Sequence, residues 1–275
     1  MPDSEILPAQ ATKLLPDLTA IVARASALIR AQSAATVARR LKADQSPVTA
    51  ADEASEAVIL QGLAELLPNV PVISEEMAGD KASPALARCF ITVDPLDGTR
   101  EYLAGRDEFT VNLAIITRGV PIAGIIAAPN HNKIWRGIVG GQVERLRLLP
   151  DGADQPQAIR TRRWPAQGAV ASVSRSHLDP NTEAFLSRLG PVTRNPSGSA
   201  IKFCHIAEGA VDVYPRLATT CEWDVAAGHA LVAAAGGIVT TPQATPIPYG
   251  RVAENFRVPA FIAWGDPGKA VSVEQ

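Results

Sequence analysis

The sequence predicts a mixed α/β protein, with an α+β part at its amino-terminal end and an α/β part at its carboxy-terminal end. Near the amino terminus, apolar residues recur at three- and four-residue steps, the pattern of amphipathic helices. Between residues 70 and 141, short apolar runs are separated by Gly, Pro and Asn, which is typical of strands joined by turns. After residue 168, helix-like and strand-like segments alternate, which favours an α/β layer.

Two helices are predicted first. The apolar periodicity indicates one helix from Leu14 to about Lys42. Pro47 then breaks the chain, and Thr49 is a suitable N-cap for a second helix that ends at Pro68. Each helix has one apolar side, so we expect both to pack on a sheet.

Five apolar runs that follow the second helix predict that sheet, and they cover residues 70–74, 88–94, 109–119, 121–129 and 133–141. Residues 148–168 are rich in Pro, Gly, Gln and charge and show no sustained apolar period. We therefore predict a boundary there, with one subdomain over residues 1–155 and a second over residues 156–275. The alternating segments of the second subdomain are 169–174, 180–189, 199–209, 210–215, 223–237 and 261–265.

Composition and charge exclude several classes of protein. Lys and Arg number 26 against 28 Asp and Glu, so nothing indicates a nucleic-acid partner or an acidic tail. The three cysteines form no CxxC pair, which argues against a disulfide framework or a structural zinc site and favours a reducing compartment. No run of about 18 apolar residues and no signal-peptide pattern occurs. We expect a cytoplasmic protein without a membrane span, and loose attachment to a membrane surface stays open.

Acidic residues gather at the predicted ends and turns, where their side chains are able to converge. Carboxylate and carbonyl oxygens without His or Cys suit Mg²⁺ or Mn²⁺ rather than zinc. Two such ions about 3.5–4 Å apart would clamp the attacking and leaving oxygens of a phosphoryl transfer. The candidate residues are Asp52, Glu53, Glu75, Glu76, Asp94, Asp97, Glu222 and Asp224.

Each acidic element also has an ordinary explanation. The DPLDG segment that contains Asp94 and Asp97 is a common turn sequence, and Glu75 with Glu76 fits a solvated helix start. Asp52 and Asp224 are suitable charges for the amino-terminal ends of helices. Their joint occurrence in this order is what favours a metal site.

The segments SPVTAADEAS, VISEE, DPLDGT and EWDVAAGHALVAAAGG resemble the four signatures of the magnesium-dependent, lithium-sensitive phosphatases of the inositol monophosphatase superfamily. This resemblance runs from about residue 47 to residue 237. Further segments, including SRSH, CEWD and GSAIKFCHIAEGAVDVYPRL, are similar to the bacterial 3′(2′),5′-bisphosphate nucleotidase branch, CysQ. Ser74 and Arg100 are mild departures from the pattern. The resemblance implies a layered α-β-α-β-α sandwich. It also implies a homodimer, although no segment of the sequence indicates a dimer by itself.

The resemblance implies two or more Mg²⁺ ions, with Mn²⁺ as a substitute. Glu75, Asp94 and the backbone carbonyl of Leu96 would hold one ion. Asp94, Asp97 and Asp224 would hold the second. The Pro-Leu turn between the two aspartates would then direct two carboxylates and one carbonyl toward the same ions.

The resemblance also implies the catalytic and phosphate-binding residues. Thr99 and Asp52 would orient and deprotonate the attacking water, with the hydroxyl passing its proton to the carboxylate. Gly98 and Thr99 would offer backbone N–H groups to the phosphate, helped if a helix begins there. Glu76 would polarise the water or the metal cluster.

For the rest of the substrate, the resemblance implies contacts from His177, Ser199, Lys202 and Arg216. Ser199 and Lys202 are three residues apart, so we expect both on one helix face. A second phosphate would suit Arg216, because a planar guanidinium group binds phosphate through two hydrogen bonds. A solvated helix face or a surface ion pair is the alternative for Lys202 and Arg216.

These residues predict a Mg²⁺-dependent phosphatase that hydrolyses 3′-phosphoadenosine 5′-phosphate to AMP and phosphate, without a covalent intermediate. The resemblance places this reaction in the disposal of a by-product of sulfate assimilation. An inositol or sugar phosphatase with the same fold is the first alternative. A non-catalytic binding or regulatory protein on this fold is the second, and it gives no reason for the complete set of acidic ligands.

Overall fold

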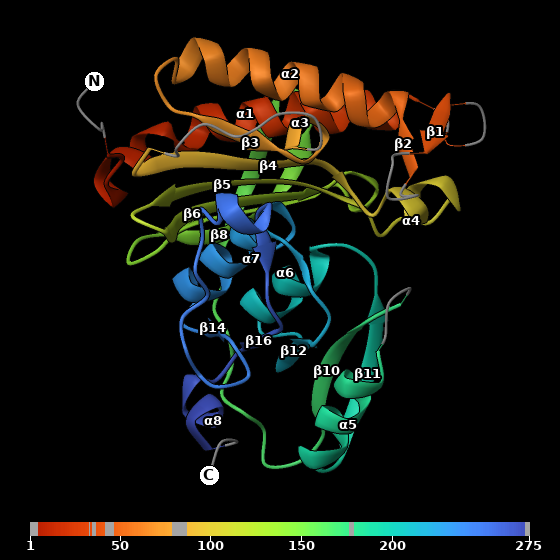
Figure 1. Cartoon of the computed structure of the whole chain (residues 1–275), viewed down its shortest axis with the longest axis vertical. Helices are drawn as coiled ribbons and strands as arrows, with labels where there is room; N and C mark the ends of the chain where they lie inside the picture. Colours follow the sequence, from red (N-terminus) through yellow and green to blue (C-terminus); the bar gives the residue numbers. More distant parts are fainter. Residues whose placement is uncertain are drawn as a thin grey trace.

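The computed structural model describes residues 5–32, 34, 37–41, 47–78, 87–175 and 179–272. Figure 1 shows alternating layers, in which long helices near the amino terminus cover a large sheet and shorter helices separate this sheet from a second one. Further helices lie on the far side of the second sheet (Figure 1). This is the α-β-α-β-α arrangement that the resemblance to the inositol monophosphatase superfamily implied. No helix among these residues is long and apolar enough to cross a membrane.

The outer layer contains α1 (Pro8–Ala31) and α2 (Ala50–Leu66). The predicted extension of the first helix to Lys42 is wrong, because its buried apolar residues stop at Ile29 and Gln32 is extended. The strand β1 (Arg39–Leu41) instead pairs with β2 (Pro47–Thr49). The prediction for α2 is confirmed, since the Thr49 hydroxyl accepts the N–H groups of Ala51 and Asp52.

The large sheet has seven strands in the order β3-β4-β5-β6-β7-β8-β9. Among the described residues, β3 pairs with β4 in parallel, and the other neighbours in this sheet are antiparallel. The strands are β3 (Val72–Ser74), β4 (Cys89–Asp97), β5 (Thr110–Thr117), β6 (Val120–Ala128), β7 (Lys133–Ile138), β8 (Val143–Leu149) and β9 (Gly152–Ala158).

The strand β9 lies within residues 148–168, where the sequence shows no sustained apolar period. Its four last residues are exposed and it lies at the sheet edge, so it has no apolar alternation that sequence analysis can detect. The predicted division after residue 155 falls inside this strand, and the division into two subdomains stays a prediction.

The second sheet has five strands in the order β11-β10-β12-β16-β14. Its strands are β10 (Ala169–Ser174), β11 (Val192–Ser197), β12 (Val213–Arg216), β14 (Ile238–Thr240) and β16 (Phe261–Trp264). A separate small pair joins β13 (Thr220–Cys221) to β15 (Arg257–Val258). The remaining helices are α3 (Glu75–Ala78), α4 (Thr99–Leu103), η1 (Pro129–His131), α5 (Pro180–Arg188), α6 (Ile201–Ala207), α7 (Glu222–Ala234), η2 (Val252–Glu254) and α8 (Pro267–Ser272).

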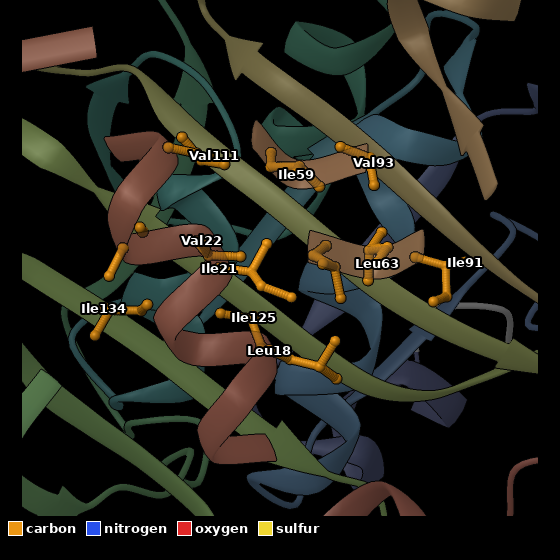
Figure 2. Close-up of a cluster of buried hydrophobic side chains, with 14 of the residues drawn as sticks. Leu18, Ile21, Val22, Ile59, Leu63, Ile91, Val93, Val111, Ile125 and Ile134 are labelled. Atoms are coloured by element: carbon orange, nitrogen blue, oxygen red, sulfur yellow. The ribbon is translucent and has the colours of Figure 1, made fainter. Parts of the chain in front are cut away.

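The strands β4 and β5 are buried almost throughout, and their successive side chains point to opposite faces of the large sheet, so both faces are covered there. Figure 2 shows the face toward α1 and α2, where Ile91 and Val93 of β4 lie among the apolar side chains of the two helices. Phe90 and Ala114 belong to the opposite core, with residues of α6 and α7. The central strands therefore hold a fixed position between two helical layers.

The helix α7 lies unusually close to the large sheet. A Cβ atom on Gly124 of β6 would lie 2.2 Å from the carbonyl oxygen of Ala227 in α7. A Cβ atom on Gly228 would lie 2.2 Å from the ring of Phe203 in α6. These two glycines set the position of α7, and with it the position of Asp224 in its first turn.

Candidate active site

A pocket of about 360 Å³ opens between the two sheets, beside the carboxy-terminal end of β4 and the first turn of α7. Most of the predicted site residues line it. They are Glu75, Asp94, Leu96, Asp97, Gly98, Thr99, Ser199, Lys202, Arg216 and Asp224.

Three of the predicted metal ligands converge in this pocket. Carboxylate oxygens of Glu75, Asp94 and Asp224 all lie within 4.8 Å of one another. Glu75 begins α3, Asp94 lies in β4, and Asp224 is in the first turn of α7. Three separate elements thus bring their carboxylates to one point, which the sequence order alone does not require.

The electrostatics of Asp94 indicate that a cation fits this point. The side chain is buried, and its Oδ2 atom has no hydrogen-bond partner among the described residues. Burial raises the pKa of Asp94 well above its usual range, and repulsion from Glu75, Asp97 and Asp224 raises it further. Clustered oxygen ligands without His or Cys are the donor set of Mg²⁺ or Mn²⁺.

Asp97 lies in the same pocket, and the protein binds one of its two oxygens. Its Oδ2 atom accepts hydrogen bonds from the backbone N–H of Ala200 at 2.5 Å, from Asn112 at 3.3 Å and from Thr110 at 3.5 Å. Burial raises the pKa of Asp97 to about 6, the charge of Asp224 adds to this, and Lys202 opposes it.

Asp224 is held in a similar way. Its Oδ2 atom accepts a short hydrogen bond from the Thr220 hydroxyl and a second from the backbone N–H of Cys221 at 3.2 Å. Both donors immediately precede α7, so the cap of the helix fixes the direction of this carboxylate.

The turn between the two aspartates brings Leu96 to the pocket wall. The register of β4 with β5 is interrupted between Asp94 and Asp97, where the chain bulges. The N–H of Leu96 donates to Asp94 Oδ1 at 3.1 Å. Ser55 of α2 donates to the carbonyl of Pro95 at 2.7 Å. The turn is therefore held from both sides.

Thr99 and Asp52 lie in contact, as their predicted roles require. The Thr99 hydroxyl lies 3.2 Å from Asp52 Oδ1 and 3.2 Å from the carbonyl of Leu96. Asp52 does not line the pocket and reaches it through Thr99. Burial raises the pKa of Asp52, although hydrogen bonds from Thr49 and Thr99 oppose this shift. A buried carboxylate behind a hydroxyl has the geometry of a proton acceptor.

Besides Asp52, two further predicted residues are not found in the pocket lining. Glu76 is half-buried in α3, next to Glu75. His177 lies outside the described residues.

The expectation that Ser199 and Lys202 share a helix face is wrong. Ser199 precedes α6 and has a left-handed backbone with φ 42°, while Lys202 is the second residue of the helix. The Lys202 ammonium donates to the carbonyls of Ser197, at 3.4 Å, and Ser199, and it lies over the ring of Tyr214. Lys202 therefore holds the turn that contains Ser199.

Arg216 ends β12 and places a guanidinium in the pocket wall. Its Nε atom is buried and has no partner among the described residues. Burial lowers the pKa of Arg216, but Tyr214, Asp224 and Asp97 raise it above its usual range. This charge is well placed to bind an anion.

Sequence analysis missed the residues that orient the carboxylates. Asn112 lies opposite Asp94 in the paired strands, a relation that depends on the register of β4 with β5. Ala200 acts through its backbone, so its side chain gives no signal. Thr220 was detectable in principle, because it lies four residues before Asp224 at a predicted helix start.

The chain is similar to known proteins over most of its length. The model of the inositol monophosphatase family matches residues 11–260. The 3′(2′),5′-bisphosphate nucleotidase CysQ of Escherichia coli strain K12 is 41% identical over 221 residues, which cover 80% of this chain and 86% of the relative. The CysQ of Aggregatibacter actinomycetemcomitans is 29% identical over 265 residues, covering 93% and 94% of the two chains.

Solved structures show the same likeness. The crystal structure of CysQ from Bacteroides thetaiotaomicron, a bacterial member of the inositol monophosphatase family, matches with a TM-score of 0.76 and 32% identity. The match covers 92% of this chain and 97% of the other. An inositol monophosphatase from Anabaena matches with a TM-score of 0.72 and 25% identity, covering 96% and 97%. The chain therefore belongs to the inositol monophosphatase family.

Proposed function

We propose that this protein is a metal-dependent phosphatase that hydrolyses 3′(2′),5′-bisphosphate nucleotides. The observation that carries this proposal is the group of Glu75, Asp94 and Asp224 carboxylates, within 4.8 Å of one another and beside the Arg216 guanidinium in one pocket. The relatives named CysQ, at up to 41% identity, support the nucleotide as the substrate class.

The chain has a suitable set of ligands for two or more Mg²⁺ ions, with Mn²⁺ as a substitute. Glu75, Asp94 and the Leu96 carbonyl would hold one ion, and Asp94, Asp97 and Asp224 the other. Bound there, the ions would act as Lewis acids on the phosphoryl group and lower the pKa of the attacking water.

The proton of the attacking water has a path through residues of the chain. The Thr99 hydroxyl would accept it and pass its own proton to Asp52, at the observed distance of 3.2 Å. Gly98 and Thr99 would donate backbone N–H groups to the phosphate. Glu76 would polarise the attacking water or the metal ions. Because the nucleophile is water, no covalent enzyme intermediate is needed.

The second phosphate distinguishes this substrate from simple monophosphates, and Arg216 is the residue best placed to bind it. A guanidinium binds phosphate through two parallel hydrogen bonds. Ser199 and Lys202 would contact the nucleotide from the same wall, and His177 would complete the set. We propose 3′-phosphoadenosine 5′-phosphate as the preferred substrate, converted with water to AMP and phosphate, and we propose a cytoplasmic homodimer.

A phosphate-release assay with Mg²⁺ tests the proposal. The substrates are 3′-phosphoadenosine 5′-phosphate, inositol 1-phosphate and fructose 1,6-bisphosphate, with kcat/KM measured for each. We expect the highest kcat/KM for the nucleotide. A higher value for inositol 1-phosphate or the sugar phosphate would assign the chain to those substrates, and no release from any of them would favour a non-catalytic binding protein.

A further inference from the structure

An ion pair beside the pocket joins the two sheets. Glu108 precedes β5 of the large sheet, and Arg175 follows β10 of the second sheet. The Arg175 Nε and Nη2 atoms donate to the two carboxylate oxygens of Glu108 at 2.9 and 2.7 Å. Such a bidentate ion pair is geometrically more restrictive than an ion pair with a single hydrogen bond.

The same pair binds the chain that leaves β11. Glu108 Oε2 accepts the backbone N–H of Gly198 at 3.1 Å, and Arg175 Nη2 donates to the carbonyl of Pro196 at 2.9 Å. The approach is close, since a Cβ atom on Gly198 would lie 2.7 Å from the Glu108 carbonyl oxygen. The Glu108–Arg175 pair therefore fixes the start of the turn over residues 198–200.

That turn forms part of the pocket wall. Gly198, Ser199 and Ala200 line the pocket, whereas Glu108 and Arg175 are not among its lining residues. At the far end of the turn, the N–H of Ala200 donates to Asp97 Oδ2 at 2.5 Å. The turn is thus held at one end by the ion pair and at the other by Asp97.

The pair also balances charge near the pocket. Glu101 is buried, lines the pocket and interacts electrostatically with Arg175. Burial raises the pKa of Glu108, but the hydrogen bonds and charge of Arg175 outweigh this and lower it overall. Without Arg175, the negative charges of Glu101 in the pocket lining and of Glu108 beside it would be less compensated.

We propose that Glu108 and Arg175 are positioning residues for the proposed reaction, which hold the turn over residues 198–200 against Asp97 and so set how tightly substrate binds. Neither the Glu108 nor the Arg175 side chain would contact the substrate, since neither lines the pocket. The inference rests on the proposed function for its kinetic consequence, while the effect on the turn can be measured without turnover.

The test uses Arg175→Met, Glu108→Gln and the double variant. The control is Arg147→Met. It removes the bidentate ion pair between Arg147 of β8 and Asp154 of β9, which does not line the pocket. Hydrogen exchange followed by mass spectrometry reports on residues 196–202, and steady-state kinetics with 3′-phosphoadenosine 5′-phosphate and Mg²⁺ gives kcat and KM.

We expect Arg175→Met to speed exchange over residues 196–202 and to raise KM about tenfold, with a smaller change in kcat, since hydrogen bonds to charged groups have effects of this size. The double variant should match Arg175→Met, because the two residues act as a unit. Arg147→Met should change neither quantity.

Unchanged exchange in both single variants would overturn the proposal. Faster exchange with an unchanged KM would also overturn it, because the pair would then have only a structural role. If the unaltered chain released no phosphate from the nucleotide, the proposed function would fail, and the exchange data alone would decide whether the pair holds the turn.

Discussion

The hydrogen bonds of Asp97 orient its carboxylate in a way that suits a bound cation. One of its oxygens accepts three hydrogen bonds from the protein, which fixes the side chain and leaves the other oxygen for a ligand. Its pKa of about 6 reflects burial and the nearby charge of Asp224. A divalent cation would favour the ionised form of this group and remove the repulsion.

Asp97→Asn should leave the fold intact and lower kcat about a thousandfold, because losing roughly 4 kcal/mol of transition-state stabilisation has that effect. The asparagine keeps one acceptor oxygen for Ala200, Asn112 and Thr110, but it removes the charge. The measurement is kcat at saturating Mg²⁺, with circular dichroism as the check on folding. Turnover near that of the unaltered protein would remove Asp97 from the mechanism.

His229 gives a prediction about stability rather than catalysis. It lies half-buried in α7, its Nδ1 atom lies 2.9 Å from the Tyr249 hydroxyl, and desolvation of the ring lowers its pKa from 6.5 to about 4. Because the folded-state pKa is lowered, the unfolded chain binds the proton more readily between these two values. The stabilisation is complete above pH 6.5 and is lost as the pH falls toward 4.

This group alone should lower the free energy of unfolding by about 2 kcal/mol between pH 7.5 and pH 5. Urea unfolding at both values of pH, for the unaltered protein and for His229→Gln, measures it. The glutamine does not titrate, so the variant should lose less stability over this range. Equal losses in the two proteins would show that His229 does not titrate as described.

Among the single elements, α7 is positioned by its close packing on the large sheet, and this packing places Asp224 in the pocket. Gly124→Ala would place a methyl group 2.2 Å from the carbonyl oxygen of Ala227 and push α7 away. We expect a loss of about 1–3 kcal/mol in the free energy of unfolding. We also expect weaker Mg²⁺ binding, because Asp224 moves with the helix.

Gly152→Ala on β9 is the matched control, because a Cβ atom there has no neighbour within 4 Å. Urea unfolding and calorimetric Mg²⁺ titration should separate the two variants. If Gly124→Ala were as stable as Gly152→Ala, the close approach of α7 would not be a constraint.

Elements whose signals are local could be predicted from the sequence. Thr49 marked the start of α2, and the pattern from Asp94 to Thr99 marked the turn at the end of β4. The end of α1 was misjudged, because the described residues between 32 and 41 include apolar ones, such as Val37 and Leu41, that do not belong to the helix. The strand β9 was missed because an exposed edge strand has no apolar face to detect.

Contacts between distant elements were harder to predict. The resemblance to a known family supplied the pairing of Asp52 with Thr99, which no spacing in the sequence indicates. The hydrogen bonds from Asn112 and Ala200 to Asp97 depend on strand register and on a backbone turn. Neither feature has a signature in a single sequence.

On the scale of the whole molecule, the site is built from two layers. Glu75 and Asp94 come from the region of the large sheet, whereas Asp224 belongs to the helical layer between the sheets. Mutual repulsion of these carboxylates opposes the packing of the layers. A cation that binds all three should therefore stabilise the entire fold.

We expect Mg²⁺ at a hundred times its dissociation constant to stabilise the protein by about 2.7 kcal/mol, the value for a ligand that binds only the folded state. Thermal unfolding with Mg²⁺ and with EDTA measures the difference. Asp94→Asn should reduce the shift, and an equal shift in that variant would indicate that Mg²⁺ binds elsewhere.

The metal dependence of turnover tests the central claim most directly. The purified protein is depleted of metal with EDTA, and phosphate release from 3′-phosphoadenosine 5′-phosphate is followed as Mg²⁺ is restored. We expect no measurable release without metal and full recovery at saturating Mg²⁺. Undiminished release in the presence of EDTA would contradict it.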